Sequence, residues 1–190
     1  MSDELVEVLD EKGNKTGRVL PRHELHEQEL WHSSAFVWVY NSKGEVLIQF
    51  RTKDRRSFPN VWDVSAAGHT LVGDSPLDGA VREVREEIGL KISKSELIKV
   101  AQIPDITHFI GGRKHLQFCW VYILHKDVDL HDLKIQKEEL SKIKWISIKD
   151  LIAELKDPKK SKAYAGRNIQ IYESAFNEIQ SQLGKNWGEL

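Results

Sequence analysis

Three glutamates, Glu83, Glu86 and Glu87, are the residues of this chain whose types and spacing best suit chemistry. Intervals of three and four residues put them on one face of a helix. Like charges placed this way repel one another, and a divalent ion such as Mg²⁺ or Mn²⁺, which prefers carboxylate oxygens, would remove the penalty. Arg82 precedes Glu86 by four residues and can orient it. Taken alone, the helix would suggest a solvated acidic face balanced by Arg82 and Arg85.

The helix that must position these acids is predicted from Ser75 to Ile88. Ser75 can cap it, Pro76 suits its first position, and Gly89 can end it. Its apolar residues recur at helical spacing and are Leu77, Ala80, Val81, Val84 and Ile88. The glutamates lie beside this stripe, so we expect them at the edge of the core, where a cleft can form.

The segment around this helix resembles the Nudix box, G-x5-E-x7-R-E-U-x-E-E-x-G-U, in which U is an aliphatic residue. The positions in register are Gly68, Arg82, Glu83, Val84, Glu86, Glu87, Gly89 and Leu90. One position departs, because Asp74 stands where the box has its first glutamate. In the family that residue supports the loop more than it binds metal, so the resemblance implies that metal binding survives the shorter side chain.

The resemblance implies a fold and an activity. In the Nudix fold an α/β/α sandwich surrounds a mixed sheet, and the activity is hydrolysis of a diphosphate linkage in a small organic substrate. The metal ligands carried over are the Gly68 carbonyl and the carboxylates of Glu83, Glu86 and Glu87, which would hold Mg²⁺ (or Mn²⁺).

The resemblance leaves the general base open. Glu86 is the candidate within the box, assisted by Glu83 and Arg82 as the other expected catalytic residues. Other members of the family take the base from a later loop, where this chain offers Glu138 and Glu139.

Candidate substrate contacts lie outside the acidic helix. Arg51, Lys53 and Arg55 precede the box and could grip a diphosphate, although for Lys53 and Arg55 an exposed loop charge is the simpler interpretation. His69, next to the box glycine, is a further expected contact. Packed, hydrogen-bonded histidines are more common than ligands, so metal binding by His32 or His69 is not the first expectation.

The segments before the box are similar to those of one Nudix branch in particular. The resemblance to this branch covers roughly residues 5 to 155. This branch includes type I isopentenyl-diphosphate isomerase and its hydrolase relatives. The matching segments are Trp31-His32, residues 34–40, Gly44 to Leu47 with Arg51, and Pro59 to Asp63.

Within that branch, isomerisation is the alternative to hydrolysis. The isomerase needs a catalytic cysteine, which this chain replaces with Ala67. It also holds a metal, partly by histidines, two of which His32 and His69 match, and partly by acidic ligands, where this chain has no acid from Gly111 to Leu116. A methyl group cannot donate a proton, so hydrolysis is favoured. A non-catalytic nucleotide-binding module is a further alternative, but such modules usually lose box glutamates that this chain keeps.

The remaining elements predict an α/β (α+β) fold. We expect a hairpin over residues 5–20, a loop over residues 22–31, and a C-terminal helix marked by the residues Ile169, Tyr172, Phe176, Ile179 and Leu183. Strands are expected at residues 34–40, 45–51, 61–66, 97–103, 116–124 and 142–147, and a short helix at residues 148–155. These elements suggest an N-terminal hairpin extension (1–30), a Nudix domain (31–157) and a C-terminal helix packed on the same domain (158–190).

The amino-acid composition limits the kinds of partner and environment that we expect for this protein. The chain has 28 basic and 29 acidic residues, a net charge of −1, which does not favour a nucleic-acid polymer. Cys119 is the only cysteine and lies in the longest apolar run, residues 118–124, far short of the roughly 20 residues that cross a bilayer. Without a secretory signal, a cytoplasmic protein with a small-molecule diphosphate substrate is expected. The chain could also form a homodimer.

Overall fold

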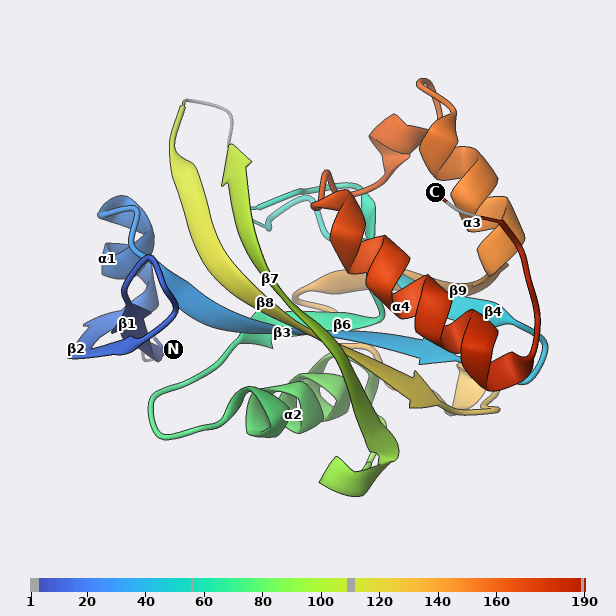
Figure 1. Ribbon diagram of the computed structural model, residues 1–190, viewed down its shortest axis with the longest axis horizontal. Coiled ribbons are helices and arrows are strands. Elements are labelled where there is room, and N and C mark those ends of the chain that lie inside the picture. Colours follow the sequence, from blue (N-terminus) through green and yellow to red (C-terminus); the bar gives the residue numbers. More distant parts are fainter. Residues whose placement is uncertain (1–3, 56, 109–111, 189) are drawn as a thin grey trace.

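The computed structural model describes residues 4–55, 57–108, 112–188 and 190, and a mixed sheet of seven strands lies at its centre (Figure 1). The strands of this sheet are β3 (His32–Tyr40), β4 (Glu45–Arg51), β5 (Trp62–Asp63), β6 (Ala66–His69), β7 (Leu97–His108), β8 (Lys114–His125) and β9 (Leu140–Ser147). A separate antiparallel hairpin consists of β1 (Leu5–Leu9) and β2 (Lys15–Pro21). The α-helices are α1 (Arg22–Glu27), α2 (Pro76–Ile88), α3 (Ile148–Lys156) and α4 (Ile169–Leu183), and single 3₁₀ turns occupy Lys94–Glu96, Leu130–Asp132 and Ser161–Ala163. The predicted α+β class, with a mixed sheet, is confirmed.

Strand β3 connects the two halves of the sheet. It runs parallel to β8, with His32 opposite Gln117 and Tyr40 opposite His125, and antiparallel to β4 and β6. Strand β9 pairs with β4, and β7 forms the edge beyond β8. The short strand β6, which carries the box glycine, is therefore held directly against the centre of the sheet.

The core lies on both faces of this sheet, because successive side chains of a strand point to opposite sides. On one face, Phe36 and Trp38 of β3 pack with residues of α3 and α4. On the other face, Ala35 and Val37 pack with α2. Burial on both faces explains why β3 reads as a continuous apolar run instead of an alternating one. The sheet and its two layers of helices thus fix α2 against β3 and β6 (Figure 1).

Two predicted elements are corrected by the structure. The expected loop over residues 22–31 contains helix α1, whose only buried residue is Leu25. One apolar residue in six gives no helical period, so the sequence pattern could not reveal it. The expected strand over residues 61–66 is two short strands with different partners, since β5 pairs with β4 and β6 pairs with β3.

Several strands also extend beyond the ranges that the sequence predicted. Strand β7 continues past Ile103 to His108, through the buried polar residues Asp105 and Thr107. The Asp105 carboxylate accepts hydrogen bonds from the Thr107 hydroxyl at 2.9 Å and from the side-chain amide of Gln117 on β8 at 3.0 Å, and the second of these contacts is not contained in a local sequence pattern.

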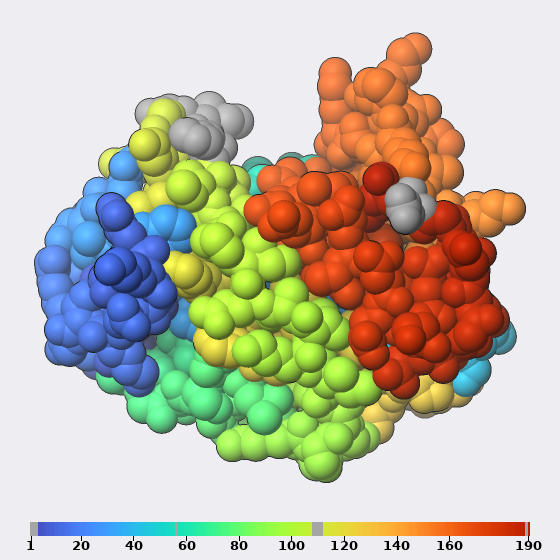
Figure 2. Space-filling model, in the orientation of Figure 1, coloured from blue at the N-terminus to red at the C-terminus, as the bar shows by residue number. Residues whose placement is uncertain are grey.

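The N-terminal hairpin and the C-terminal helices lie on opposite sides of β7 in the space-filling view (Figure 2). The hairpin is tied to the box loop by an isolated bridge between Val6 and Leu71. Helix α4 packs on β7 and β8. Over the described part of the chain, no helix combines the length and the apolar character needed to cross a membrane.

Candidate active site

Helix α2 begins and ends where its residue types predict. The Ser75 hydroxyl accepts a hydrogen bond of 3.2 Å from the Asp78 backbone N–H, and the Asp78 carboxylate accepts one from the Ser75 N–H at 3.2 Å. At the other end, Gly89 adopts a left-handed conformation with φ of 76°. Val84 and Ile88 are fully buried, which prevents rotation of the helix about its axis. The orientation of the acids is thus set by caps and core contacts.

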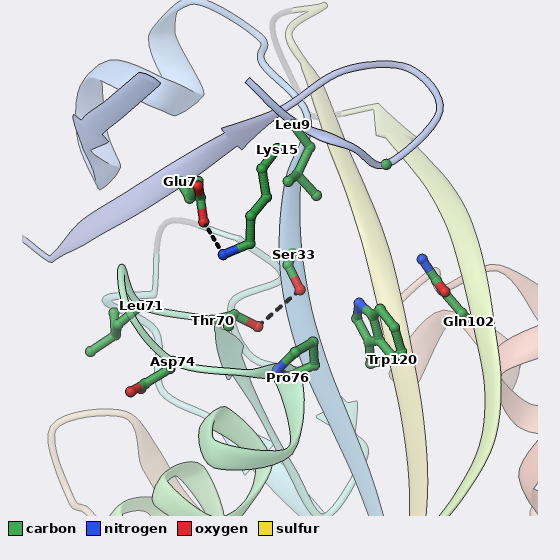
Figure 3. Close-up of a pocket in the computed structure, with 11 residues that line it drawn as sticks. Glu7, Leu9, Lys15, Ser33, Thr70, Leu71, Asp74, Pro76, Gln102 and Trp120 are labelled. Carbon is green, nitrogen blue, oxygen red and sulfur yellow. Dashed lines mark hydrogen bonds and ion pairs between the residues drawn. The ribbon is translucent and has the colours of Figure 1, made fainter. Parts of the chain in front are cut away.

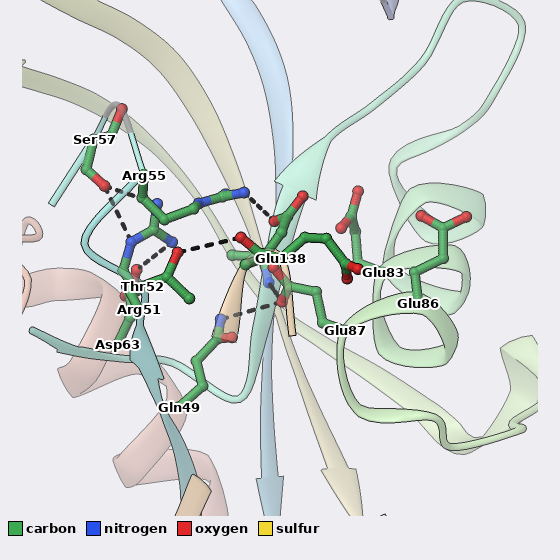
Figure 4. Close-up of polar contacts among 12 residues, drawn as sticks. Gln49, Arg51, Thr52, Arg55, Ser57, Asp63, Glu83, Glu86, Glu87 and Glu138 are labelled. Atoms are coloured by element: carbon green, nitrogen blue, oxygen red, sulfur yellow. Dashed lines mark hydrogen bonds and ion pairs between the residues drawn. The ribbon is translucent and has the colours of Figure 1, made fainter. Parts of the chain in front are cut away.

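Glu87 is the most buried of the three acids, with 1% of its surface exposed. Its Oε2 accepts hydrogen bonds from the Gln49 side-chain amide at 3.1 Å and from the Ala67 N–H at 2.9 Å (Figure 4). Its Oε1 is also buried, yet it has no hydrogen-bond partner among the described residues. Burial raises the pKa of Glu87 well above its ordinary value, and the nearby Glu83 raises it further.

Glu83 lies directly against the box glycine. A Cβ atom placed on Gly68 would stand 2.1 Å from Cδ and Oε1 of Glu83, so no side chain fits there unless the carboxylate moves. Burial raises the pKa of Glu83 to about 7. Two buried carboxylates are thus adjacent, and a proton or a cation between them would relieve the cost of their charges.

Arg82 joins the acids to the box loop. Its Nη1 lies 2.6 Å from Oε1 of Glu83 and 3.0 Å from Oε2 of Glu86, and its Nη2 donates to the His69 carbonyl at 2.6 Å. Asp74, the shortened box residue, is 3.9 Å from the guanidinium. The Glu86 side chain is 43% exposed, in contrast to the other two acids. Arg82 therefore fixes the position of an acid that solvent can reach.

The expected substrate contact Arg51 is 4% exposed. Its guanidinium donates to the Ser57 and Phe58 carbonyls and lies 3.3 Å from the carboxylate of Asp63 (Figure 4). Arg51 thus holds together β4, β5 and the segment between them. Lys53, in contrast, is exposed just after β4.

The candidate bases of the later loop lie near this segment. Glu139 forms an ion pair with Arg55 and is close enough to Glu87 to raise its pKa. Glu138 has an exposed side chain, and its backbone carbonyl accepts a hydrogen bond of 3.2 Å from Thr52 (Figure 4).

His69 belongs to a different group of side chains. It is 7% exposed, and its Nε2 lies 3.0 Å from Nε2 of His26. His32 and His115 complete a cluster whose potential ligand atoms all lie within 4.8 Å of one another. Sequence reasoning singled out His32 and His69 but missed their two partners.

Gln49 is a second residue that sequence reasoning missed. It is fully buried on β4 and orients Glu87. A signal for it existed, since it is the one polar residue between Val46 and Phe50. His26 and His115 had no such local signal, because only the folding of α1 and the pairing of β8 bring them to His32.

A small cavity of about 120 Å³ lies between the box loop and the N-terminal hairpin (Figure 3). The pair Glu7–Lys15, at 2.6 Å, and the Ser33–Thr70 hydroxyl contact, at 2.9 Å, line it together with Trp120. None of the three box glutamates lines this cavity.

Comparison with known proteins supplies the family context. The model of the NUDIX domain family matches residues 30–166. An uncharacterized Nudix hydrolase of Clostridium acetobutylicum is 33% identical over 189 residues, which cover 98% of this chain and 90% of that protein. Nudix hydrolase 3 of Arabidopsis thaliana is 35% identical over 151 residues, which cover 77% of this chain but 19% of that larger protein.

Two further comparisons concern the branch and the fold. An isopentenyl-diphosphate Delta-isomerase of Cutibacterium acnes is 29% identical over 155 residues, covering 78% of this chain and 76% of the isomerase. The crystal structure of a Deinococcus radiodurans protein superposes with a TM-score of 0.66 at 18% identity, covering 94% of this chain and 98% of that one.

Proposed function

This chain belongs to the Nudix family of hydrolases, which act on diphosphate bonds, and we propose that it hydrolyses a small organic diphosphate with the help of Mg²⁺. The residues that would hold the ion are Glu83, Glu86 and Glu87 with the Gly68 carbonyl. The observation that supports this assignment best is the buried Oε1 of Glu87, which has no hydrogen-bond partner in the described part of the chain.

The donor set fits a hard divalent ion. All the proposed ligands are oxygen atoms, which Mg²⁺ and Mn²⁺ prefer over nitrogen or sulfur. Glu83 and Glu87 are buried next to each other, an arrangement that costs free energy when both are ionised without a counterion. When bound, the ion neutralises phosphate oxygens and lowers the pKa of the attacking water.

The protein residues have separate tasks in this proposal. Gln49 and the Ala67 N–H hold one oxygen of Glu87, which leaves the other oxygen for the ion. Arg82 positions Glu86, whose partly exposed carboxylate is our first candidate to accept the proton of the attacking water. Such positioning and charge stabilisation provide most of the catalysis in attack at phosphorus.

Glu138 is the alternative base, since Glu139 is already paired with Arg55. The variant Glu138→Gln distinguishes the two assignments. If Glu86 is the base, Glu138→Gln should keep most of kcat, and if Glu138 is the base, it should remove most of kcat. Glu86→Gln should lower kcat in either case, because Glu86 is also a proposed metal ligand.

For the substrate, we propose a nucleoside-diphosphate-like or similar organic diphosphate. Among the cations predicted to grip it, Lys53 is exposed, whereas the guanidinium of Arg51 already contacts protein oxygens. The test is a screen of nucleoside diphosphates, nucleoside triphosphates, sugar nucleotides and isoprenoid diphosphates with Mg²⁺, measuring release of phosphate or pyrophosphate. Absence of hydrolysis for every class, with Mg²⁺ and with Mn²⁺, would contradict the proposal.

We also propose that residues 1–30 and 158–190 form one folded unit with residues 31–157. The bridge between Val6 and Leu71 and the packing of α4 on β7 and β8 support this view. Separate unfolding transitions for either terminal segment would argue against it.

A further inference from the structure

Two arginines from distant parts of the chain share one buried carboxylate near the proposed site. Arg51 ends β4 and Arg167 lies just before α4, and both pair with Asp63 of β5, whose side chain is fully buried. These three residues form an arginine clamp. We propose that Arg167 is a positioning residue, which acts through the clamp to hold the connecting segment between β4 and β5 where it can grip the substrate's diphosphate. This inference rests on the hydrolysis proposed above.

The geometry of the clamp depends on the planar guanidinium of Arg167. Its Nε donates to Oδ1 of Asp63 at 3.2 Å, and its Nη2 donates to Oδ2 at 2.5 Å. Nη1 of Arg51 donates to the same Oδ2 at 3.3 Å. A lysine at position 167 would keep the charge but could not reproduce a two-pronged pair with the carboxylate.

Both guanidinium groups of the clamp stay charged. Burial lowers the pKa of Arg51, but only to about 10. Burial acts on Arg167 in the same direction, yet Asp63 raises the pKa of Arg167 above its ordinary value. Two positive charges therefore share one negative charge, and the excess favours an anion such as a diphosphate beside the clamp.

The connecting segment, residues 52–61 without residue 56, has a backbone that its own residues disfavour. Phe58 and Asn60 have positive φ values of 49° and 56°, and a bulky side chain rarely adopts this conformation. Such a conformation persists where the surrounding structure imposes it. Arg51 does so here, because its guanidinium donates to the Ser57 carbonyl at 2.9 Å and to the Phe58 carbonyl at 3.1 Å (Figure 4).

Arg167 also contacts the strained residue directly. Its guanidinium carbon lies 4.7 Å from the centre of the Phe58 ring and 5.0 Å from the centre of the Phe36 ring on β3. The side chain of Arg167 is 6% exposed, so it occupies the space between the sheet and the segment. Removing it would therefore release both the Phe58 ring and the carboxylate that orients Arg51.

The connecting segment in turn contacts the loop before β9. The Thr52 N–H donates to the Glu139 carbonyl at 2.9 Å, the Thr52 hydroxyl donates to the Glu138 carbonyl at 3.2 Å, and Arg55 pairs with Glu139 (Figure 4). Lys53 lies between these two anchors, which set where its ammonium can reach. The proposed Mg²⁺ ligands come from β6 and α2 instead. Loss of the clamp should thus weaken diphosphate binding more than Mg²⁺ binding.

The first test measures binding of Mg²⁺ and, at saturating Mg²⁺, of inorganic pyrophosphate by calorimetry on the full chain. Arg167→Met and Arg167→Lys should each weaken pyrophosphate binding by about tenfold, since small misplacements of gripping residues are costly. Both should keep the wild-type affinity for Mg²⁺ to within about twofold. Lys162→Met removes an exposed cation from the same connection between α3 and α4 and is the matched control, which should bind pyrophosphate as the wild type does.

The second test combines Arg167→Met with Lys53→Ala. Lys53→Ala should weaken pyrophosphate binding in the wild type and add little in the Arg167→Met background, because the segment that carries Lys53 is already displaced. A residue that only stabilises the fold would give additive effects. This cycle can be read even if no compound of the substrate screen is hydrolysed, so a failure of the proposed hydrolysis and a failure of the clamp are distinguishable. With a hydrolysed substrate, KM should rise in Arg167→Met more than kcat falls.

Hydrogen exchange without ligand provides a readout that is independent of binding. Exchange in the connecting segment should be faster in Arg167→Met than in the wild type, while β3 and β8 exchange alike in both. If Arg167→Met does not fold, Phe58→Leu, which removes the ring contact and keeps the ion pairs, should show the same changes to a smaller degree. Wild-type pyrophosphate affinity in the folded variant, an equal loss of Mg²⁺ affinity, or additivity with Lys53→Ala would each overturn the proposal.

Discussion

The carboxylate of Glu87 accepts a hydrogen bond of 2.9 Å from the backbone N–H of Ala67, which joins helix α2 to strand β6 inside the site. Ala67 is the residue that replaces the catalytic cysteine expected of an isomerase, so its backbone contributes even though its methyl group has no acid–base role. Because Gln49 binds the same oxygen, the second oxygen of Glu87 is the one available to a cation. The geometry of the site thus depends on contacts between residues far apart in the chain.

The most direct prediction concerns Glu83 and Glu87. Glu83→Gln and Glu87→Gln should each lower kcat by roughly two orders of magnitude or more, because a neutral amide neither holds the ion nor balances its charge. Circular dichroism should show an unchanged fold, and calorimetry should show weaker Mg²⁺ binding. Glu11→Gln, on the exposed hairpin turn, is the control and should change neither property. Full activity in both variants would remove these residues from the site.

The pH dependence of stability provides a second prediction. In the metal-free protein the pKa of Glu83 is raised from 4.5 to about 7, so between these values the folded state keeps a proton that the unfolded state has lost. The contribution of Glu83 to the free energy of unfolding is therefore fully present below pH 4.5 and is lost as the pH rises toward about 7. The loss amounts to at most about 1.4 kcal/mol per pH unit.

The measurement for this prediction compares wild type with Glu83→Gln in chelator. The buried imidazoles His32, His69 and His115 act in the opposite direction, since their pKa values are lowered, but both proteins share them. The wild type should therefore lose stability relative to the variant as the pH rises through this window, and Mg²⁺ should reverse the loss. A difference that stays constant with pH would mean that Glu83 is not buried as an acid.

Gly68 and Gly79 offer a matched pair for the third prediction. A Cβ on Gly68 would stand 2.1 Å from Glu83, whereas a Cβ on Gly79 of α2 would stand 3.6 Å from its nearest neighbour, an ordinary contact distance. Gly68→Ala should displace the Glu83 carboxylate and weaken both metal binding and kcat. Gly79→Ala should keep activity and stabilise the helix by up to about 1 kcal/mol. Equal activity in the two variants would show that the close approach of Gly68 and Glu83 is unimportant.

The acidic helix was predictable because the residues that define its ends and its acidic face are close together in the sequence. Ser75, Pro76 and Gly89 mark its ends, and the spacing of Glu83, Glu86 and Glu87 is contained in one turn and a half of chain.

Other features of the site depend on tertiary pairing. Arg51 looked like a free cation, yet it is buried because Asp63 and the carbonyls before β5 surround its guanidinium. His115 reaches His32 only because β8 lies parallel to β3, a pairing that no short stretch of sequence encodes.

The runner-up activity can be tested directly. With Ala67 in place of a cysteine, no conversion of isopentenyl to dimethylallyl diphosphate is expected. The single cysteine, Cys119, is fully buried, and burial raises the pKa of its thiol well above the usual value, so it is not a ready substitute. Incubation with isopentenyl diphosphate and separation of the two isomers would decide. Product formed in proportion to enzyme concentration would reverse our ranking of hydrolase over isomerase.

The last prediction concerns the residues that hold α2 in register. Val84 lies between Glu83 and Glu87 in the sequence of α2. Its side chain is fully buried against the face of the sheet that includes Ala35 and Val37. Val84→Asp would place an unpaired charge in this core, which costs several kcal/mol and should abolish both folding and activity. Asp74→Ala should do much less, because Asp74 is partly exposed and 3.9 Å from Arg82, and such pairs contribute about 0–1 kcal/mol. Thermal unfolding of both variants, with kcat measured on the folded fraction, separates the two effects. If the core contacts of α2 were lost, a rotation of the helix by one residue, about 100°, would move the acids out of the site. A folded and active Val84→Asp would therefore mean that these contacts do not set the position of the acids.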